Sequence, residues 1–264
     1  LFFGLFFLFF IARQDWKVVI GAAIGWLSLT LIALSMCGLQ SYYDYWQVLH
    51  TINWYAAAQN GSLYGFLSRL FGGNTISAPL LLAPYLKVAL YGLGVLAIVA
   101  HLCQIVWRDR KSRHAAEMKE IHFNFFLVAM LLISPLGWSY YFIFFIPTFV
   151  LLLQYSGHAR TENKLFFLTL LALFFVAFPG VIISRQPVLS LTEMFVTFAY
   201  NFYALVILYG ALIVMRQSVG RQNILPQLGR ITADRRHCMI AAFLPSIAGV
   251  LFIFTSIYNY WQLA

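Results

Sequence analysis

The sequence predicts an all-α, polytopic integral membrane protein. Hydrophobic residues make up 62% of the chain and charged residues only 9%, and the mean hydropathy is +0.82. These values lie far outside the usual range of a soluble domain. Apolar runs approaching the ~20 residues of a spanning helix recur along the sequence, separated by short charged or Gly/Pro-containing breaks. We therefore expect residues 1–264 to form a single transmembrane domain.

The apolar runs predict about seven full spans that follow a partial first one. The partial run covers 1–11, and the full runs cover 18–36, 84–106, 118–133, 136–154, 165–183, 195–215 and 239–257. The first run is half a span, and the chain opens on Leu1 without the basic residues of a signal peptide. We therefore expect a truncated chain whose N-terminal part precedes this sequence.

Lysine and arginine predict the orientation of the chain. Fourteen of the 17 basic residues lie in alternate breaks, at 12–17, 107–120, 155–164 and 216–238. The positive-inside rule makes these breaks cytoplasmic and makes the long segment 37–83 an extracytoplasmic loop. The net charge of +9 then follows from topology and requires no nucleic-acid partner. For 107–120, a solvated loop and a site for phosphate or anionic lipid both stay open.

The cysteines and histidines predict no metal site. Three cysteines and six histidines are scattered over both predicted faces, without the close spacing of metal ligands. The sequence also has no Gly-rich phosphate loop, nucleophile elbow or internal repeat. We therefore expect neither a metal nor another cofactor.

The first half of the predicted outer loop is rich in aromatic rings. The loop 37–83 is longer than most connections between helices, and it begins with the ring-rich stretch "SYYDYWQVLHTINWYAAAQ". Such rings collect at a membrane boundary because one end is apolar and the other polar. A wall that stacks a sugar or guides a lipid is the other interpretation. Asp44, within this stretch, is either an ordinary exposed acid or a candidate catalytic group.

The second half of this loop, "NGSLYGFLSRLFGG", predicts a short helix. Ser62 is the expected N-cap, and Gly72-Gly73 the expected stop. A helical projection separates an apolar arc from an arc of small and polar residues, namely Ser62, Gly65, Ser68, Arg69 and Gly72. We expect an interfacial helix with its apolar arc toward the membrane. Uncrowded by its neighbours, Arg69 either pairs with a phosphate or extends to lipid headgroups.

A second motif, "SPLGWSYYFIFFIP", predicts a turn at 134–147. Ser134 followed by Pro135 is typical of an N-cap and a first helical residue. The preceding apolar run, 123–133, would rise only about 17 Å as a helix. It either extends backward through 118–122 or turns below the outer surface. The second option leaves a notch at membrane depth, lined by Ser134, Trp138, Tyr140 and Tyr141.

These two motifs resemble glycosyltransferase family 87. Asn60, Ser62, Gly65 and Arg69 match the N-x-S-x-x-G-x-x-x-R pattern common in that family, while Ser134, Pro135 and Trp138 match its S-P-x-x-W pattern. The family usually has two histidines shortly after the tryptophan, where this chain has Tyr140 and Tyr141. Because tyrosine is neutral at pH 7, this departure puts a charged role at those positions in doubt.

The resemblance implies a GT-C type glycosyltransferase of a bacterial inner membrane. Such an enzyme transfers a sugar from a polyprenyl-phosphate donor to a lipid or glycan acceptor at the extracytoplasmic face. It implies that Arg69 binds the donor phosphate, that Tyr140, Tyr141 and Trp138 bind phosphate or lipid, and that Asn60, Ser62, Gly65 and Ser134 shape the site. It also implies a catalytic carboxylate upstream of Leu1, with Asp44 as the weaker candidate.

Two other function classes stay open at this point. A transporter or lipid flippase usually places ionisable residues within the membrane, whereas every acid here falls in a predicted break. No feature of the sequence argues against a third class, a scaffolding subunit of an envelope-polymer assembly.

Overall fold

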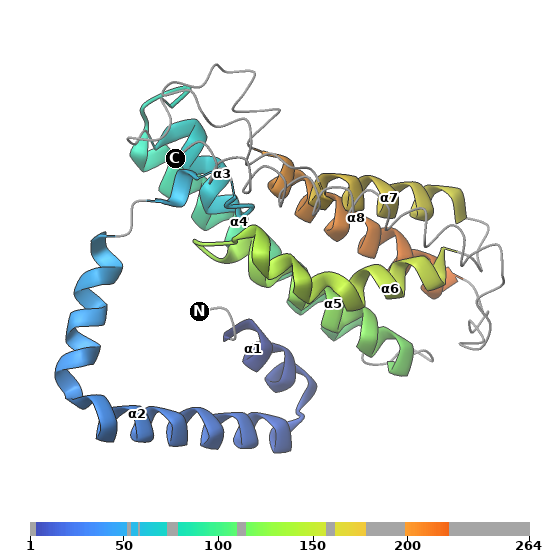
Figure 1. Cartoon of the computed structure of the whole chain (residues 1–264). Coiled ribbons are helices and arrows are strands. Elements are labelled where there is room, and N and C mark those ends of the chain that lie inside the picture. Colours follow the sequence, from blue (N-terminus) through green and yellow to red (C-terminus); the bar gives the residue numbers. More distant parts are fainter. Residues whose placement is uncertain are drawn as a thin grey trace, which may run out of the picture.

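The computed structural model describes residues 4–51, 54–57, 59–72, 79–109, 115–156, 162–177 and 199–221. Over these ranges the chain is all-helical, which confirms the predicted class. The elements in order are α1 (Gly4–Arg13), α2 (Trp16–Thr51), η1 (Trp54–Ala56), α3 (Leu63–Phe71), α4 (Pro84–Asp109), α5 (Ala115–Ile133), η2 (Ser139–Phe145), α6 (Ile146–Tyr155), α7 (Glu162–Ala177) and α8 (Tyr200–Arg221) (Figure 1).

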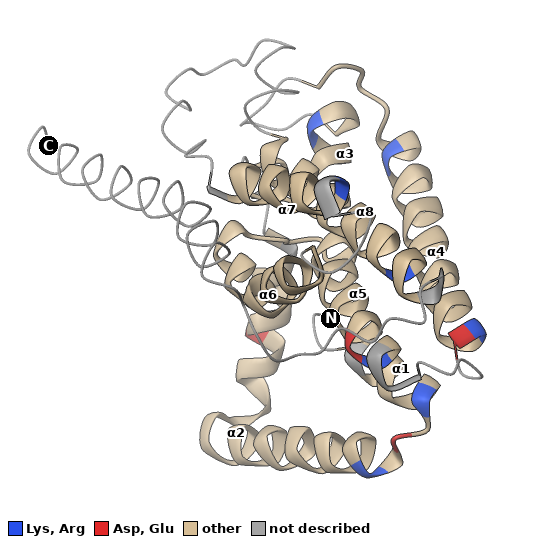
Figure 2. Cartoon of the chain, turned by 90° about the vertical axis from the view of Figure 1, so that its right-hand side faces the viewer, with Lys and Arg blue, Asp and Glu red and all other residues tan. Residues whose placement is uncertain are grey.

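Within the described ranges, three helices are long and apolar enough to cross a membrane: Trp16–Leu49, Pro84–Asp109 and Tyr200–Val219. These helices, which overlap three of the predicted spans, support a membrane protein. Long stretches of the helices carry no charged residue, as Figure 2 shows by colour. The total of seven spans stays a prediction, and the run at 239–257 lies outside the described residues.

Helix α2 is longer than the predicted span 18–36, and it continues into the first part of the predicted outer loop. The helix continues past Cys37 to Thr51, with a kink at Gly38, where φ is 73° and ψ is 167°. A positive φ of this kind favours glycine, because it has no Cβ to clash. Two arms of α2 therefore run in different directions (Figure 1). The ring-rich stretch up to Thr51 forms the second arm, since residues 39–51 contain no glycine or proline to end the helix.

Helix α5 forms the centre of the core. Ile121, Phe125, Val128 and Leu131 on this helix are fully buried, and α5 contacts α1, α3, α4, η2 and α8. From α1, Phe9 packs its ring against Phe126, with centroids 5.0 Å apart. Because every residue of 125–133 is apolar and buried, this part of α5 is an interior helix. Helix α5 extends back to Ala115 and is therefore about 28 Å long. Of the two options for the apolar run 123–133, the structure shows backward extension through 118–122.

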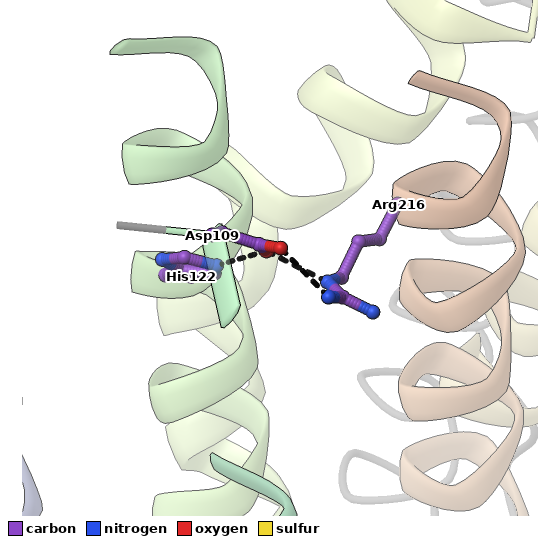
Figure 3. A network of polar contacts seen from close by, with 3 residues as sticks. All are labelled: Asp109, His122 and Arg216. Atoms are coloured by element: carbon purple, nitrogen blue, oxygen red, sulfur yellow. Dashed lines mark hydrogen bonds and ion pairs between the residues drawn. The ribbon is translucent and has the colours of Figure 1, made fainter. Parts of the chain in front are cut away.

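A buried polar network ties three helices together at one end of α5 (Figure 3). Arg216 of α8 donates two hydrogen bonds of 2.8 Å to the carboxylate of Asp109 at the end of α4. His122 of α5 lies 2.8 Å from the same carboxylate. The sequence placed Asp109 and Arg216 in the cytoplasmic breaks 107–120 and 216–238, but α4 and α8 continue through these residues. Their charges satisfy one another inside the protein, so neither side chain needs an exposed loop.

Replacing Asp109 with asparagine tests this network. D109N should lower the free energy of unfolding by about 3 kcal/mol, because it leaves the partly buried Arg216 without its counter-charge. The double variant D109L/R216M should recover much of the loss, since apolar residues need no partner. Thermal unfolding in detergent micelles measures both effects. Arg108, the exposed neighbour on α4, supplies the control: equal losses in D109N and R108M would show that the network contributes no stability.

Candidate functional site

The two motifs that lie far apart in the sequence meet in space. A short antiparallel bridge pairs Asn60 with Trp138. Within it, the Gly61 amide donates to the Gly137 carbonyl over 2.8 Å, and the Ser139 amide donates to the Gln59 carbonyl over 3.0 Å. We call residues 59–69 and 134–139 together the motif junction. It lies at the C-terminal end of α5, away from the Asp109 network.

The side-chain amide of Asn60 holds the motif junction together. Its nitrogen donates to the carbonyls of Tyr55 and Pro135, each over 2.8 Å. Its oxygen accepts from the amides of Ser62 at 3.1 Å and Gly137 at 2.9 Å. The residue is fully buried, and these four bonds use both donors and both lone pairs of the amide. No other neutral side chain of this size presents that combination.

Ser62 and Gly65 fit helix α3 against this amide. Ser62 is the N-cap, as predicted: its Oγ accepts from the Gly65 amide over 3.0 Å and donates to the Pro135 carbonyl over 3.3 Å. Gly65 faces Asn60 so closely that a Cβ there would lie 2.6 Å from Cγ and Nδ2 of Asn60. Glycine at position 65 is therefore needed for packing rather than for backbone freedom.

Ser134 does not cap a helix, contrary to the prediction. Helix α5 ends at Ile133, and the next helical segment, η2, begins at Ser139 after Trp138. The buried Ser134 instead accepts a hydrogen bond from the Leu136 amide over 3.3 Å. The reason is that the carbonyl of Pro135 and the backbone of Gly137 are already bonded to residues 60–62, which keeps this segment extended.

Arg69 lies inside the protein, which corrects the expectation of an uncrowded side chain on an interfacial helix. It is only 1% exposed, and Gly65 and Ser68 on the same arc are also buried. Its Nη1 donates to the carbonyls of Ala57 and Asn60 over 2.9 and 3.1 Å. The polar arc of α3 therefore faces the protein interior, because backbone carbonyls there accept the hydrogen bonds that water would otherwise accept.

Two nitrogens of the Arg69 guanidinium, Nε and Nη2, have no hydrogen-bond partner among the described residues. Burial lowers the pKa of Arg69 to about 10, and nearby Tyr200 and Tyr203 partly oppose this shift. The side chain therefore stays positively charged at neutral pH. Nε and Nη2 form one edge of the planar guanidinium, the geometry that binds two oxygens of a carboxylate or phosphate side by side. Arg69 thus offers an anion two unused, parallel donors.

Four aromatic rings lie in a row at the margin of the junction. We call them the aromatic ladder: Trp138, Tyr140, Tyr141 and Phe144. Trp138 stacks on Tyr140 with an interplanar angle of 9° and centroids 6.1 Å apart, and Tyr140 contacts Tyr141 at 4.4 Å. Tyr141 in turn stacks on Phe144 at 6.2 Å. The Tyr140 side chain is 63% exposed. The ladder therefore presents aromatic surface outward, beside the motif that contains Arg69.

Asp44 is not brought to the junction. It lies exposed on the second arm of α2, where its carboxylate accepts a hydrogen bond from Gln40 over 2.8 Å. Among the described residues, no hydrogen bond or ion pair links Asp44 to residues 59–69 or 134–139. The structure thus unites the two family-like motifs but leaves this acid apart.

The sequence analysis missed the part that helix α8 plays beside the junction. Phe202 stacks on Phe66 of α3 at 4.3 Å and 9°. A Cβ on Gly61 would lie 2.9 Å from Cβ of Asn201, so the backbone of Gly61 passes directly against Asn201. Asn201 is fully buried and is the first strongly polar residue of an apolar span. A polar side chain in such a span was the signal that could have identified it.

Alanine substitution of two glycines tests the packing at Asn60. G65A should cost about 2 kcal/mol of stability, because the new methyl group must displace the hydrogen-bonded amide of Asn60. Gly92 in α4 is the matched control, because nothing lies within 4 Å of a Cβ built there. G92A should stabilise the helix by about 0.5–1 kcal/mol. Thermal unfolding compares the two, and a G65A protein as stable as G92A would contradict the close contact.

One of three comparisons with known proteins gives a match, and it covers the first motif and the start of the second. Neither the curated proteins nor the solved structures contain a significant match. The family model of glycosyltransferase family 87 matches residues 1–135 of the 264-residue chain, a range that contains Asn60, Arg69 and Pro135. With half of its length covered by that match, and with helices long enough to span a membrane, the chain belongs to glycosyltransferase family 87, and this membership implies a membrane glycosyltransferase.

Proposed function

We propose that the chain transfers a sugar from a polyprenyl-phosphate donor to a lipid or glycan acceptor at the extracytoplasmic face of a bacterial inner membrane. The observation that carries this proposal is the unpaired edge of Arg69, positioned within the family motif. Nη1 is held by the carbonyls of Ala57 and Asn60, which fixes the plane of the guanidinium. Nε and Nη2 are then left to bind two phosphate oxygens of the donor.

Arg69 would contribute most as the sugar leaves the phosphate. In an inverting transfer, the acceptor hydroxyl oxygen attacks the anomeric carbon, while the bond from that carbon to the phosphate oxygen breaks. The electron pair of that bond leaves with the polyprenyl phosphate, and a carboxylate takes the hydroxyl proton. The departing phosphate gains negative charge, which a fixed, desolvated cation stabilises more strongly than water does. Asp44, which lies apart from Arg69, has no role in this proposal.

The aromatic ladder would hold the lipid part of the donor. Trp138, Tyr140 and Tyr141 present rings at the margin of the junction, and such rings suit the level where headgroups meet acyl chains. Tyr140 and Tyr141 can also donate hydrogen bonds to a phosphate while staying neutral. Asn60, Ser62, Gly65 and Ser134 then shape the site by holding the two motifs together, without contacting the donor.

The Asp109 network does not favour the alternative of a proton- or ion-coupled transporter. Transport coupled to ions needs an ionisable group that can exchange its partner. Both oxygens of Asp109 are bound by Arg216, and one is also bound by His122. This saturated arrangement suits a structural tie better than a proton relay.

Substitution of Arg69 in the full-length protein tests the proposed phosphate contact. R69A should lower kcat/KM for sugar transfer in membranes by roughly 100-fold, and R69K should recover part of it, because lysine keeps the charge but not the paired donors. K87M is the control, because it also removes a positive charge while Lys87 lies outside the family motif, with its Nζ over the Tyr64 ring, 5.0 Å from the centroid. Unchanged transfer by folded R69A protein would remove Arg69 from the mechanism.

Truncation of Tyr140 tests the ladder. Y140A should raise KM for the polyprenyl donor about fivefold and leave kcat nearly unchanged, because the ring is assigned to binding alone. Phe167 on α7 is a control of matched exposure, at 62% against 63%. If Y140A and F167A alter KM equally, the ladder has no specific role in donor binding.

A further inference from the structure

Unpaired polar atoms concentrate where α3 meets α8. Among the described residues, seven buried side-chain nitrogen or oxygen atoms have no hydrogen-bond partner, and five of them belong to Ser68, Arg69 and Asn201. These residues are at most 5% exposed. Leaving a buried polar atom unpaired costs about 1–3 kcal/mol, so several at one place call for an explanation beyond stability.

Arg69 and Asn201 border the same peptide. The Nη1 of Arg69 donates to the Asn60 carbonyl, and the next residue, Gly61, lies against Cβ and the backbone of Asn201. Tyr200 and Tyr203, on either side of Asn201 in α8, are close enough to influence the charge of Arg69. Asn201 also lies in the first turn of α8, where the helix dipole favours negative charge. We call Ser68, Arg69 and Asn201 the α3–α8 cluster.

The free groups of this cluster differ in chemistry. The open edge of Arg69 contains only donors, so it suits an anion. Neither Nδ2, a donor, nor Oδ1, an acceptor, of the Asn201 amide is in a well-formed hydrogen bond, although the Tyr200 side chain lies close enough to interact with this amide. A phosphate that bridges a sugar and a lipid carries acceptors alone and cannot satisfy Oδ1. A sugar hydroxyl both donates and accepts, so it can pair with this amide.

We propose that Asn201 binds a hydroxyl group of the donor sugar, next to the phosphate held by Arg69. The inference rests on the proposed function, and it adds a specificity-determining residue on α8, beyond the family match that ends at residue 135. The cluster is closed in the structure, with Phe66 stacked on Phe202 across the α3–α8 contact. Donor binding therefore requires α3 and α8 to part, and the hydroxyl and phosphate then satisfy groups that are otherwise unpaired.

Binding measurements on the full-length protein in detergent test this assignment. The probes are undecaprenyl phosphate and the same lipid carrying mannose or, in a second series, a pentose. N201L should weaken binding of the sugar-bearing lipid that the wild-type protein prefers by roughly tenfold and leave affinity for undecaprenyl phosphate within about twofold. N201A should give the same pattern, which removes dependence on the fit of leucine. R69A should weaken binding of every probe.

A stability measurement separates ligand binding from a structural role. Without ligand, N201L should unfold at the same temperature as wild type or higher, because it removes two unpaired buried atoms. Asn124 of α5 is the matched control, since its amide oxygen accepts from Thr148 over 2.6 Å and its nitrogen donates to Glu120 over 2.8 Å. N124L should lower stability and leave probe affinities unchanged.

The outcomes distinguish this inference from the proposed function. Unchanged affinity of N201L and N201A for both sugar-bearing lipids would overturn the role of Asn201, as would destabilisation of N201L equal to that of N124L. Unchanged affinity of R69A for undecaprenyl phosphate would instead overturn the phosphate contact of the proposed function. Loss of sugar discrimination in N201L, with phosphate binding intact, supports the inference.

Discussion

The side-chain amide of Asn60 is the contact on which one end of the helix bundle depends. It joins two segments separated by more than 70 residues, because its four hydrogen bonds reach Tyr55, Ser62, Pro135 and Gly137. Removing the amide would leave buried donors and acceptors unpaired, at about 1–3 kcal/mol each. The start of α3, and with it the position of Arg69, follows from this one side chain. Most of the family motif therefore holds the two segments together, and the buried polar atoms without a partner in this stretch belong to Ser68 and Arg69.

Buried charges are paired with a counter-charge at one end of the bundle but not at the other. At the N-terminal end of α5, Arg216 neutralises Asp109, and these two residues and His122, which bonds to the same carboxylate, hold three helices together. Near its C-terminal end, Arg69 is buried with no carboxylate partner in the part of the chain that the structure describes, and backbone carbonyls accept its hydrogen bonds. A buried charge that lacks a counter-charge costs stability, unless a ligand supplies one. This contrast suggests that one end is structural and that the other is kept ready for an anion.

Sequence-based predictions and the structure agree most closely for features that depend on residues near one another in the sequence. Hydropathy predicted a helical membrane protein, and each predicted span within the described residues overlaps a helix. The Ser62 cap could be predicted because it bonds to an amide only three residues away. The resemblance to glycosyltransferase family 87 also followed from short local motifs, and the family match over residues 1–135 confirmed it.

The tertiary structure decided what the sequence by itself could not. A helical projection separates the two arcs of α3, but it contains no information about which arc faces the protein; the carbonyls of Ala57 and Asn60 turned Arg69 inward. Ser134 and Pro135 resemble a helix start locally, yet pairing with residues 59–61 keeps the backbone extended. A polar residue in an apolar span marks Asn201, but its neighbours and those of the Asp109 network depend on contacts between distant helices, which no local pattern encodes. The sequence determined the class, the family and the Ser62 cap, because these depend on near neighbours; the site depends on packing between distant segments.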